Sequence, residues 1–170
     1  MAKEIVNRVA KSKLKTIDLE EFYPPGSRTI IDIKQWLFHE LILKEVDFRA
    51  DLKNHDWTIY QDQYVALTCS NDAIIPSWAY MLITTYLTPF AKRVVVGDLE
   101  SLESSIFQDI INELEIENFR ARPVIIKGCA NKPIPETAYL HLIERLQPIA
   151  SSILFGEACS TVPLFKKSSR

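Results

Sequence analysis

Glycine is scarce in this chain, with four residues in 170, and neither the GxGxxG nor the GxxxxGKS pattern occurs. Both patterns use glycines to let the backbone approach a phosphate, so the sequence argues against a dinucleotide or P-loop site. Cysteine is also scarce: there are three, an odd number, with no CxxC pair. We therefore expect reduced thiols in a cytoplasmic protein rather than a disulfide framework.

Charge of either sign is not in excess, since 20 basic residues stand against 22 acidic ones and the net charge is −2. Nucleic-acid-binding proteins usually carry a basic face, so we expect no nucleic-acid partner. The one basic run, residues 166–170, is interpreted as part of a solvated tail. Residues 1–8 lack the apolar segment of a secretory signal, which also favours the cytoplasm.

A long apolar run suitable for a membrane span is missing as well. Residues 73–91 carry no charge, but Pro76 and Pro89 interrupt them and several hydroxyl side chains make them polar. We interpret this stretch as a helix packed on a sheet, and expect no membrane partner.

The second half of the chain alternates short apolar runs with helical patterns. Strands are predicted over 64–69, 93–97, 123–128 and 161–165, and helices over 76–91, 99–115 and 136–147. Pro148 should end the last helix, and a further helical piece is predicted over 149–155. Strands that alternate with helices favour a parallel sheet with right-handed crossovers.

The first half is less regular. A strand is predicted over 15–22 and a short β-prone run at 29–31. Asp32, followed three residues later by Gln35, resembles a capping box and predicts a helix from that point. A second helix over about 44–53 would bury Val46 and Leu52.

These patterns predict a single α/β domain with three layers: a mixed, mainly parallel sheet with helices on both faces. Residues 1–62 would supply mixed N-terminal elements, 63–166 the β-α-β-α-β-α-β part, and 167–170 a flexible tail. An apolar content of 47% is enough for a core. No internal repeat and no low-complexity segment are expected.

Chemically useful residues follow three predicted strands. Cys69, Asp98 and Cys129 each stand at the carboxyl end of a strand, where open parallel sheets bind ligands. Cys159 heads the last strand. Thiolates bind zinc and iron–sulfur clusters, so Cys69, Cys129, Cys159 and Asp98 form a candidate metal site. The distances between the cysteines in the sequence match no local zinc signature.

Two alternatives stay open for the same cysteines. They could be inert, buried thiols of an interaction protein whose tryptophans, Trp36, Trp57 and Trp78, lie in the core or on a partner surface. A thiol-dependent enzyme is the other alternative, with Cys69 as nucleophile. Its general base is missing from the pattern, because the three histidines are not placed beside Cys69.

Several charged residues also admit two interpretations. Lys127 and Lys132 would lower the pKa of a nearby thiol, or would be ordinary strand-end and loop lysines. Asp98 could contact a ribose or cap the helix that follows it. His141 and Glu144, three residues apart on a predicted helix, should pair at the surface.

Several motifs occur in order along the chain and carry a resemblance: residues 4–9, 53–57, 68–70, 75–80, 96–98, 127–129 and 159–163. With these motifs, nearly the whole chain resembles the bacterial domain-of-unknown-function family number 2480. The resemblance supplies no catalytic residues. It implies an association with iron–sulfur cluster assembly, which would favour a metal-binding accessory factor.

Overall fold

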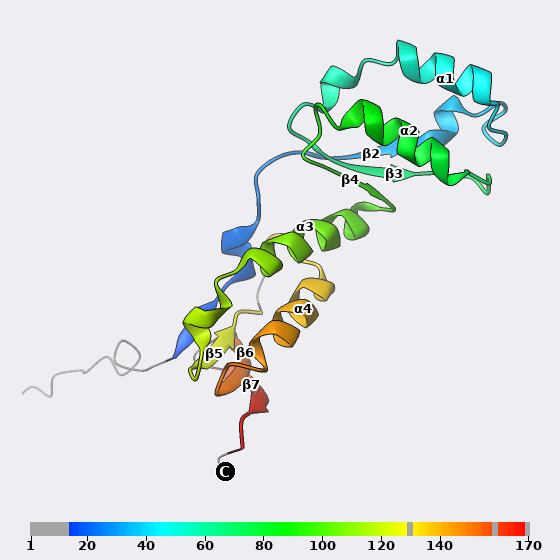
Figure 1. Ribbon diagram of the computed structural model, residues 1–170. Coiled ribbons are helices and arrows are strands. Elements are labelled where there is room, and N and C mark those ends of the chain that lie inside the picture. The colour runs from blue at the N-terminus through cyan, green and yellow to red at the C-terminus, as the bar shows by residue number, and fades with distance from the viewer. Residues whose placement is uncertain (1–13, 129–130, 158–159, 169–170) are drawn as a thin grey trace, which may run out of the picture. The chain divides into compact units, whose positions relative to one another are not determined.

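The computed structural model describes residues 14–128, 131–157 and 160–168, and these fall into two compact units. Unit 2 comprises residues 24–107, and unit 1 comprises the chain on either side of it. Figure 1 shows the elements of both. The elements of unit 2 are β2 (Arg28–Asp32), a 3₁₀ helix (Ile33–Trp36), α1 (Glu45–Asn54), a 3₁₀ helix (Trp57–Tyr60), β3 (Tyr64–Thr68), α2 (Ser77–Leu87) and β4 (Arg93–Val96).

Unit 1 is built from the two flanking parts of the chain. Its elements are β1 (Lys15–Ile17), a 3₁₀ helix (Leu19–Phe22), a 3₁₀ helix (Ile116–Phe119), β5 (Pro123–Ile126), α4 (Glu136–Leu146), β6 (Ser152–Glu157) and β7 (Ser160–Lys166). Helix α3 (Leu99–Glu113) belongs to unit 2 as far as Phe107 and to unit 1 from Gln108.

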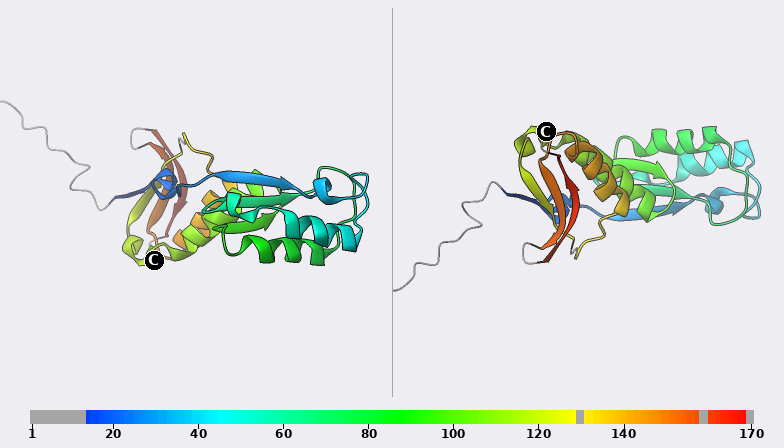
Figure 2. Two further views of the ribbon diagram at one scale, coloured as in Figure 1. Left: turned by 90° about the horizontal axis from the view of Figure 1, so that it is seen from above. Right: turned by 90° about the horizontal axis from the view of Figure 1, so that it is seen from below.

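The α/β class is confirmed, and the sheets are mostly parallel. Unit 2 holds a three-stranded parallel sheet in the order β2-β3-β4, with α1 and α2 on one face (Figure 1). Unit 1 holds the order β1-β5-β6-β7, and β7 runs antiparallel beside β6 (Figure 2). Among the described residues, no helix is long and apolar enough to cross a membrane.

The expected single sheet is divided into these two sheets. Strand β5 pairs with β1 and β6, whereas β3 and β4 pair with each other. The alternating pattern cannot show this division, because a crossover helix returns the chain to a parallel position in either arrangement. That the chain behaves as one domain stays a prediction, and the continuous helix α3 is the element that joins the units.

The two units repeat one another at a spacing of 59 residues (136 − 77). Helices α2 and α4 both have 11 residues and begin at Ser77 and Glu136. The same spacing relates β3 to β5, β4 to β6, and the 3₁₀ helices at Trp57 and Ile116. It also relates Asp62 and Ala121, two non-glycine residues with φ of 58° and 57°.

The hydrogen bonds repeat with the elements. Asp62 N donates to Phe90 O, and Ala121 N donates to Ile149 O, at 2.9 and 2.8 Å. The first strands correspond as well, because Ile17 pairs with Ile126 and Ile31 with Leu67. Each is followed by an aspartate that caps a 3₁₀ helix.

Unit 2 is therefore a second copy of the unit 1 topology, inserted between its first strand and the rest. The expectation of no internal repeat is wrong. Identical residues at the common spacing are a minority, and they include Phe48 and Phe107, Val65 and Val124, Ile75 and Ile134, Pro76 and Pro135, Ala79 and Ala138, Tyr80 and Tyr139, Leu87 and Leu146, Pro89 and Pro148, Ala91 and Ala150, and Gly97 and Gly156. Because unit 2 is inserted after the first strand of unit 1, the two copies do not follow one another in the sequence as a tandem repeat.

Three local predictions are also wrong. Residues 33–36 form a 3₁₀ helix that ends at Leu37 instead of continuing as an α-helix. Residues 152–157 form β6, where a helical piece was predicted over 149–155. On α1, Val46 is 81% exposed, and the buried face is formed by Phe48 and Leu52. Asp32 does cap the 3₁₀ helix, through a bond from Lys34 N of 3.1 Å.

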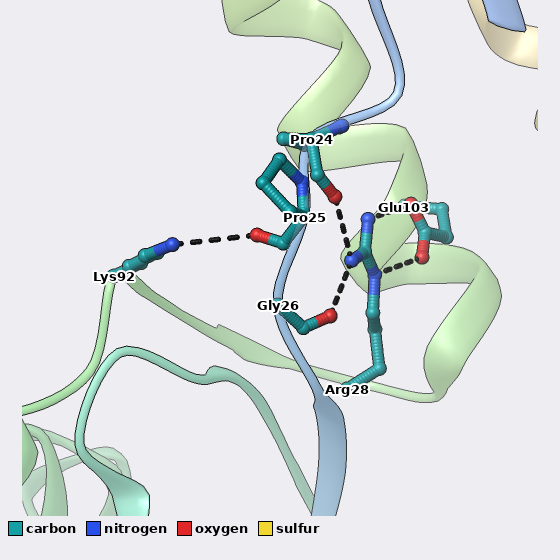
Figure 3. A network of polar contacts seen from close by, with 6 residues as sticks. All are labelled: Pro24, Pro25, Gly26, Arg28, Lys92 and Glu103. Carbon is teal, nitrogen blue, oxygen red and sulfur yellow. Dashed lines mark hydrogen bonds and ion pairs between the residues drawn. The ribbon is translucent and has the colours of Figure 1, made fainter.

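A buried ion pair holds the two ends of unit 2 together (Figure 3). Arg28 Nε donates to Glu103 Oε1 at 2.6 Å, and Arg28 Nη1 donates to the carbonyls of Pro24 and Gly26. Only 12% of the Arg28 side chain and 8% of the Glu103 side chain are exposed. The pair fastens the first turns of α3 to β2 at the place where the chain enters and leaves the unit.

Candidate functional site

A short hairpin follows the first 3₁₀ helix of unit 2. Phe38 and Ile42 form an antiparallel bridge, with N–H to carbonyl distances of 2.8 and 3.0 Å. Its turn places His39 and Glu40 at φ of 49° and 59°. The left-handed region costs a residue with a Cβ about 1–2 kcal/mol. Because two adjacent residues adopt it, the backbone of the hairpin turn is strained.

Polar and aromatic contacts hold this shape in place. Asn71, in the loop after β3, donates from Nδ2 to Glu40 O at 2.9 Å. Lys44 Nζ lies 3.2 Å from the centroid of the Phe38 ring. The Phe38 and His39 rings are in contact, with centroids 4.0 Å apart. The hairpin is therefore tied to the loop at the carboxyl end of β3.

An open apolar groove lies between the hairpin and that loop, with a volume of about 680 Å³. It is lined by Leu41, Ile42, Leu43, Glu45, Asp72, Ala73, Ile74, Pro76 and Trp78. Three of these side chains are well exposed: Leu41 by 53%, Ile42 by 57% and Ile74 by 93%. Contiguous exposed apolar side chains on a water-soluble surface usually mark an interaction site. We call this feature the hairpin groove.

Trp78 forms a fixed wall of the hairpin groove. Its ring meets the buried Phe48 ring edge-on at 5.9 Å, and the Arg49 guanidinium lies 5.4 Å from its centroid. Trp78 was expected to lie in the core or on a partner surface, and the structure shows it packed against the core as part of the groove lining.

Acidic side chains border the apolar surface. Asp72 and Glu45 line the groove, and Glu40 lies in the hairpin turn. Glu45 is paired with Arg49 at 2.9 Å, and Glu40 accepts from Asn71 at 3.4 Å. Lys44 and Arg49 lie at the same margin, so three carboxylates stand against two cations. This small acidic excess favours a ligand that is apolar and positively charged at its margin.

Among its described residues, unit 1 has no counterpart of this hairpin. After its first 3₁₀ helix the chain passes directly into unit 2 at Pro24. At the common spacing, the exposed Val46 and Ile74 correspond to Ser105 and Pro133. The hairpin that forms one side of the groove is thus found in one copy of the repeat and not among the described residues of the other.

The predicted metal site is only partly described. Cys69 is a half-buried free thiol at the end of β3 that packs against the unit 2 core. Cys129 and Cys159 lie outside the described residues. Asp98 caps α3, accepting from the backbone N and the side-chain Oγ of Ser101 at 2.8 and 2.7 Å. In the part of the chain that is described, no three His, Cys, Asp or Glu side chains gather in a way that could hold a metal.

These residues were expected to share one sheet edge if the strands ending near Cys69, Asp98 and Cys129 are neighbours. Strands β3 and β4 are neighbours, but β5 lies in the other sheet. The positions of Cys69 and Cys129 at strand ends are therefore no reason to expect the two residues at one sheet edge.

The other polar residues singled out from the sequence have structural partners. Lys127 forms an ion pair with Asp18 at 2.8 Å, and Lys132 Nζ donates to Glu20 O at 3.2 Å. His55 contacts the Tyr60 hydroxyl at 3.0 Å. His141 Nδ1 lies 3.4 Å from Glu144 Oε2, which confirms the expected surface pair.

The Asp18–Lys127 pair predicts a pH effect on stability. The side-chain hydrogen bond from Lys127 lowers the pKa of Asp18 below its ordinary value. The carboxylate therefore stabilises the fold above about pH 4, its unfolded pKa, and this is lost as the pH falls through the lowered pKa. Asp18→Asn keeps an oxygen that can accept the hydrogen bond at the start of the 3₁₀ helix. The loss of unfolding free energy in this variant therefore measures the contribution of the Asp18 charge. Urea unfolding should show a clear loss at pH 7 and a much smaller one at pH 3. An equal loss at both pH values would contradict the assignment.

The fold and the groove together define an α/β protein with a duplicated unit and an exposed apolar groove on one copy. The chain belongs to the family of proteins of unknown function designated DUF2480, whose model matches residues 3–167. No curated protein and no solved structure is significantly similar to it.

The hairpin groove was not predicted from the sequence. The run Phe38 to Leu43 was expected to continue a helix, in which its apolar residues would have been buried. A signal was available, because Leu41, Ile42 and Leu43 are three consecutive apolar residues, and no helix can bury all of them on one face.

Proposed function

We propose that this protein is an interaction module, and that the hairpin groove docks an apolar segment of another protein that carries basic residues beside its apolar ones. The observation that carries the proposal is the exposure of Leu41, Ile42 and Ile74 around a groove of about 680 Å³. Single exposed apolar residues are ordinary, but a lined groove with an aromatic wall is typical of a binding surface.

The strain of the hairpin supports the proposal. His39 and Glu40 could leave the left-handed region if the chain here were free to relax. The Asn71 bond and the Lys44–Phe38 contact oppose that relaxation. A shape maintained at a cost presents the same apolar surface to each partner molecule, which reduces the ordering cost of binding.

The position of Trp78 adds to the same argument. Its contacts with Phe48 and Arg49 hold the ring in place before any partner arrives. Rigid aromatic side chains at the centre of an apolar surface often supply much of the binding energy. The acidic margin then selects among apolar partners, because an acidic segment would be repelled by Asp72 and Glu40.

A peptide-display selection tests this function directly. Random peptides are selected on the full chain and counter-selected on Ile42→Asp, which places a charge in the groove. We expect the surviving peptides to combine apolar residues with Lys or Arg, and to bind Ile42→Asp at least tenfold more weakly. Ile59→Asp is the matched control, because Ile59 is 54% exposed and does not line the groove.

The outcomes separate cleanly. Peptides that bind wild type and Ile59→Asp equally, but not Ile42→Asp, support the groove. Peptides that bind all three proteins alike, or a selection that yields no apolar basic sequences, would overturn the proposal. Circular dichroism of each variant shows that the fold is retained.

The metal hypothesis stays a second prediction for the site Cys69, Cys129, Cys159 and Asp98, with zinc or an iron–sulfur cluster as the ligand. No group among the described residues supports it. Metal content and absorbance of protein purified without oxygen, beside Cys129→Ser, decide it. In the interaction account the thiols are inert, and reduced cysteines fit a cytoplasmic protein. A thiol-dependent enzyme would instead require one cysteine that alkylates fast in metal-free protein.

A further inference from the structure

Strand β4 of unit 2 and strand β6 of unit 1 occupy equivalent positions in the repeat. Both are the last parallel strand of their sheet, and equivalent glycines with positive φ stand near their ends: Gly97 directly follows β4, and Gly156 is the last residue but one of β6. On its outer side β6 carries the antiparallel strand β7, with Phe155 opposite Val162. Within the described residues, the sheet of unit 2 ends at β4. The outer edge of β4 is thus the position that β7 fills in the other copy.

The backbone of β4 is suited to receive a strand there. Gly97 N donates inward to Leu67 O at 2.9 Å. Because polar groups alternate in direction along a strand, the N–H and C=O of Val96 point to the outer side. An edge strand with such groups is a ready template for pairing, unless proline, a bulge or an inward charge prevents it. The strand Arg93–Val96 contains three valines and no proline.

The side chains beside this edge are apolar and exposed. Val96 is 59% exposed and Met81, on α2, is 66% exposed. With Ser77, Tyr80 and Thr84 they line an open depression of about 600 Å³. In unit 1 the residues equivalent to Tyr80 and Val96 are Tyr139 and Phe155, whose rings meet edge-on at 5.8 Å beside β7.

The charges along β4 indicate which kind of strand could pair with its outer edge. Lys92 and Arg93 stand at the start of β4, and Asp98 and Glu100 follow its end. When two copies of such a strand pair antiparallel, the basic end of each lies beside the acidic end of the other. A strand with this polarity is complementary to itself, as an isologous two-fold contact requires.

We propose that a second copy of this chain docks on β4, so that the two β4 strands pair antiparallel and join two three-stranded sheets into one. Val96 and Met81 of each copy are covered in this contact. The surface is separate from the hairpin groove, since the two share no lining residue. The proposed dimer therefore does not depend on the proposed function of the hairpin groove.

The molar mass of the full chain in solution tests the proposal. One chain is 19.5 kDa, and sedimentation equilibrium of the wild type should give twice that mass. Val96→Lys puts a charge on the pairing edge and Met81→Lys puts one on the adjoining helix. Both should weaken self-association at least tenfold and give the single-chain mass at the same concentration. Ile59→Lys, another exposed apolar position of unit 2, should leave the dimer intact.

Two results would overturn the proposal. One is a wild type with the single-chain mass at every concentration tested. The other is a dimer that persists in whichever of Val96→Lys and Met81→Lys retains the circular dichroism of the wild type. The second variant keeps the test decisive if the first fails to fold, because Met81 lies on α2 and its substitution leaves β4 unchanged.

Discussion

Replacing Arg28 by methionine should lower the free energy of unfolding by about 3 kcal/mol, which corresponds to about 6–12 °C in Tm. The substitution removes the Arg28 guanidinium from beside the Glu103 carboxylate, whose side chain is only 8% exposed. It also removes the donor that serves the carbonyls of Pro24 and Gly26. Urea unfolding followed by circular dichroism measures the loss.

The control for this prediction is Arg49→Met. Arg49 also pairs with a glutamate, Glu45, but both side chains are more than half exposed. An exposed pair of this kind contributes at most about 0.5 kcal/mol, and the contact of Arg49 with the Trp78 ring adds at most about 1 kcal/mol. The double variant Arg28→Met/Glu103→Leu should recover part of the loss, since it also removes the buried carboxylate. If Arg28→Met costs no more than Arg49→Met, the ion pair does not hold unit 2 together.

Phe48→Ala should destabilise the protein by about 3–5 kcal/mol, whereas Val46→Ala, two residues earlier on α1, should change the free energy by less than about 0.5 kcal/mol. Phe48 is fully buried against Trp36 and Trp78, and Val46 is 81% exposed. Chemical denaturation of both variants measures the two effects. Comparable losses would show that the buried face of α1 is misassigned.

The buried face of α1 could have been predicted from the sequence. Phe48 and Leu52 are four residues apart and so share a helix face, while Val46 and Leu52, six apart, do not. The prediction that paired Val46 with Leu52 therefore ignored helix geometry. By contrast, the helices at 76–91, 99–115 and 136–147 were found because Pro76, Asp98 and regular apolar spacing mark them, and the structure has α2, α3 and α4 there.

The division into two sheets could not be predicted from the pattern of elements. A parallel strand and its crossover helix look the same whichever sheet receives the strand. The decisive fact is that β1 pairs with β5, more than 100 residues along the chain, and this pairing depends on long-range contacts. The candidate metal site depended on the same adjacency of strands. Of its residues, Asp98 caps α3 and Cys69 is half-buried, whereas Cys129 and Cys159 lie outside the described residues.

The hairpin was missed for a different physical reason. Asp32 and Gln35 do begin a helical turn, and Gln35 Nε2 donates to Asp32 O at 2.8 Å. A local signal of this kind fixes the start of a turn but not its length. Tertiary contacts from Asn71 and Lys44 then stabilise left-handed residues that no propensity favours.

The most direct test of the central claim is to map a selected apolar basic peptide onto the chain by NMR. The account predicts that the amide shifts that move belong to the hairpin groove, residues 38–45 and 71–78, and that Ile42→Asp removes them. Shifts confined to other parts of the protein, or unchanged by Ile42→Asp, would contradict the claim that this groove is where the protein binds its partner.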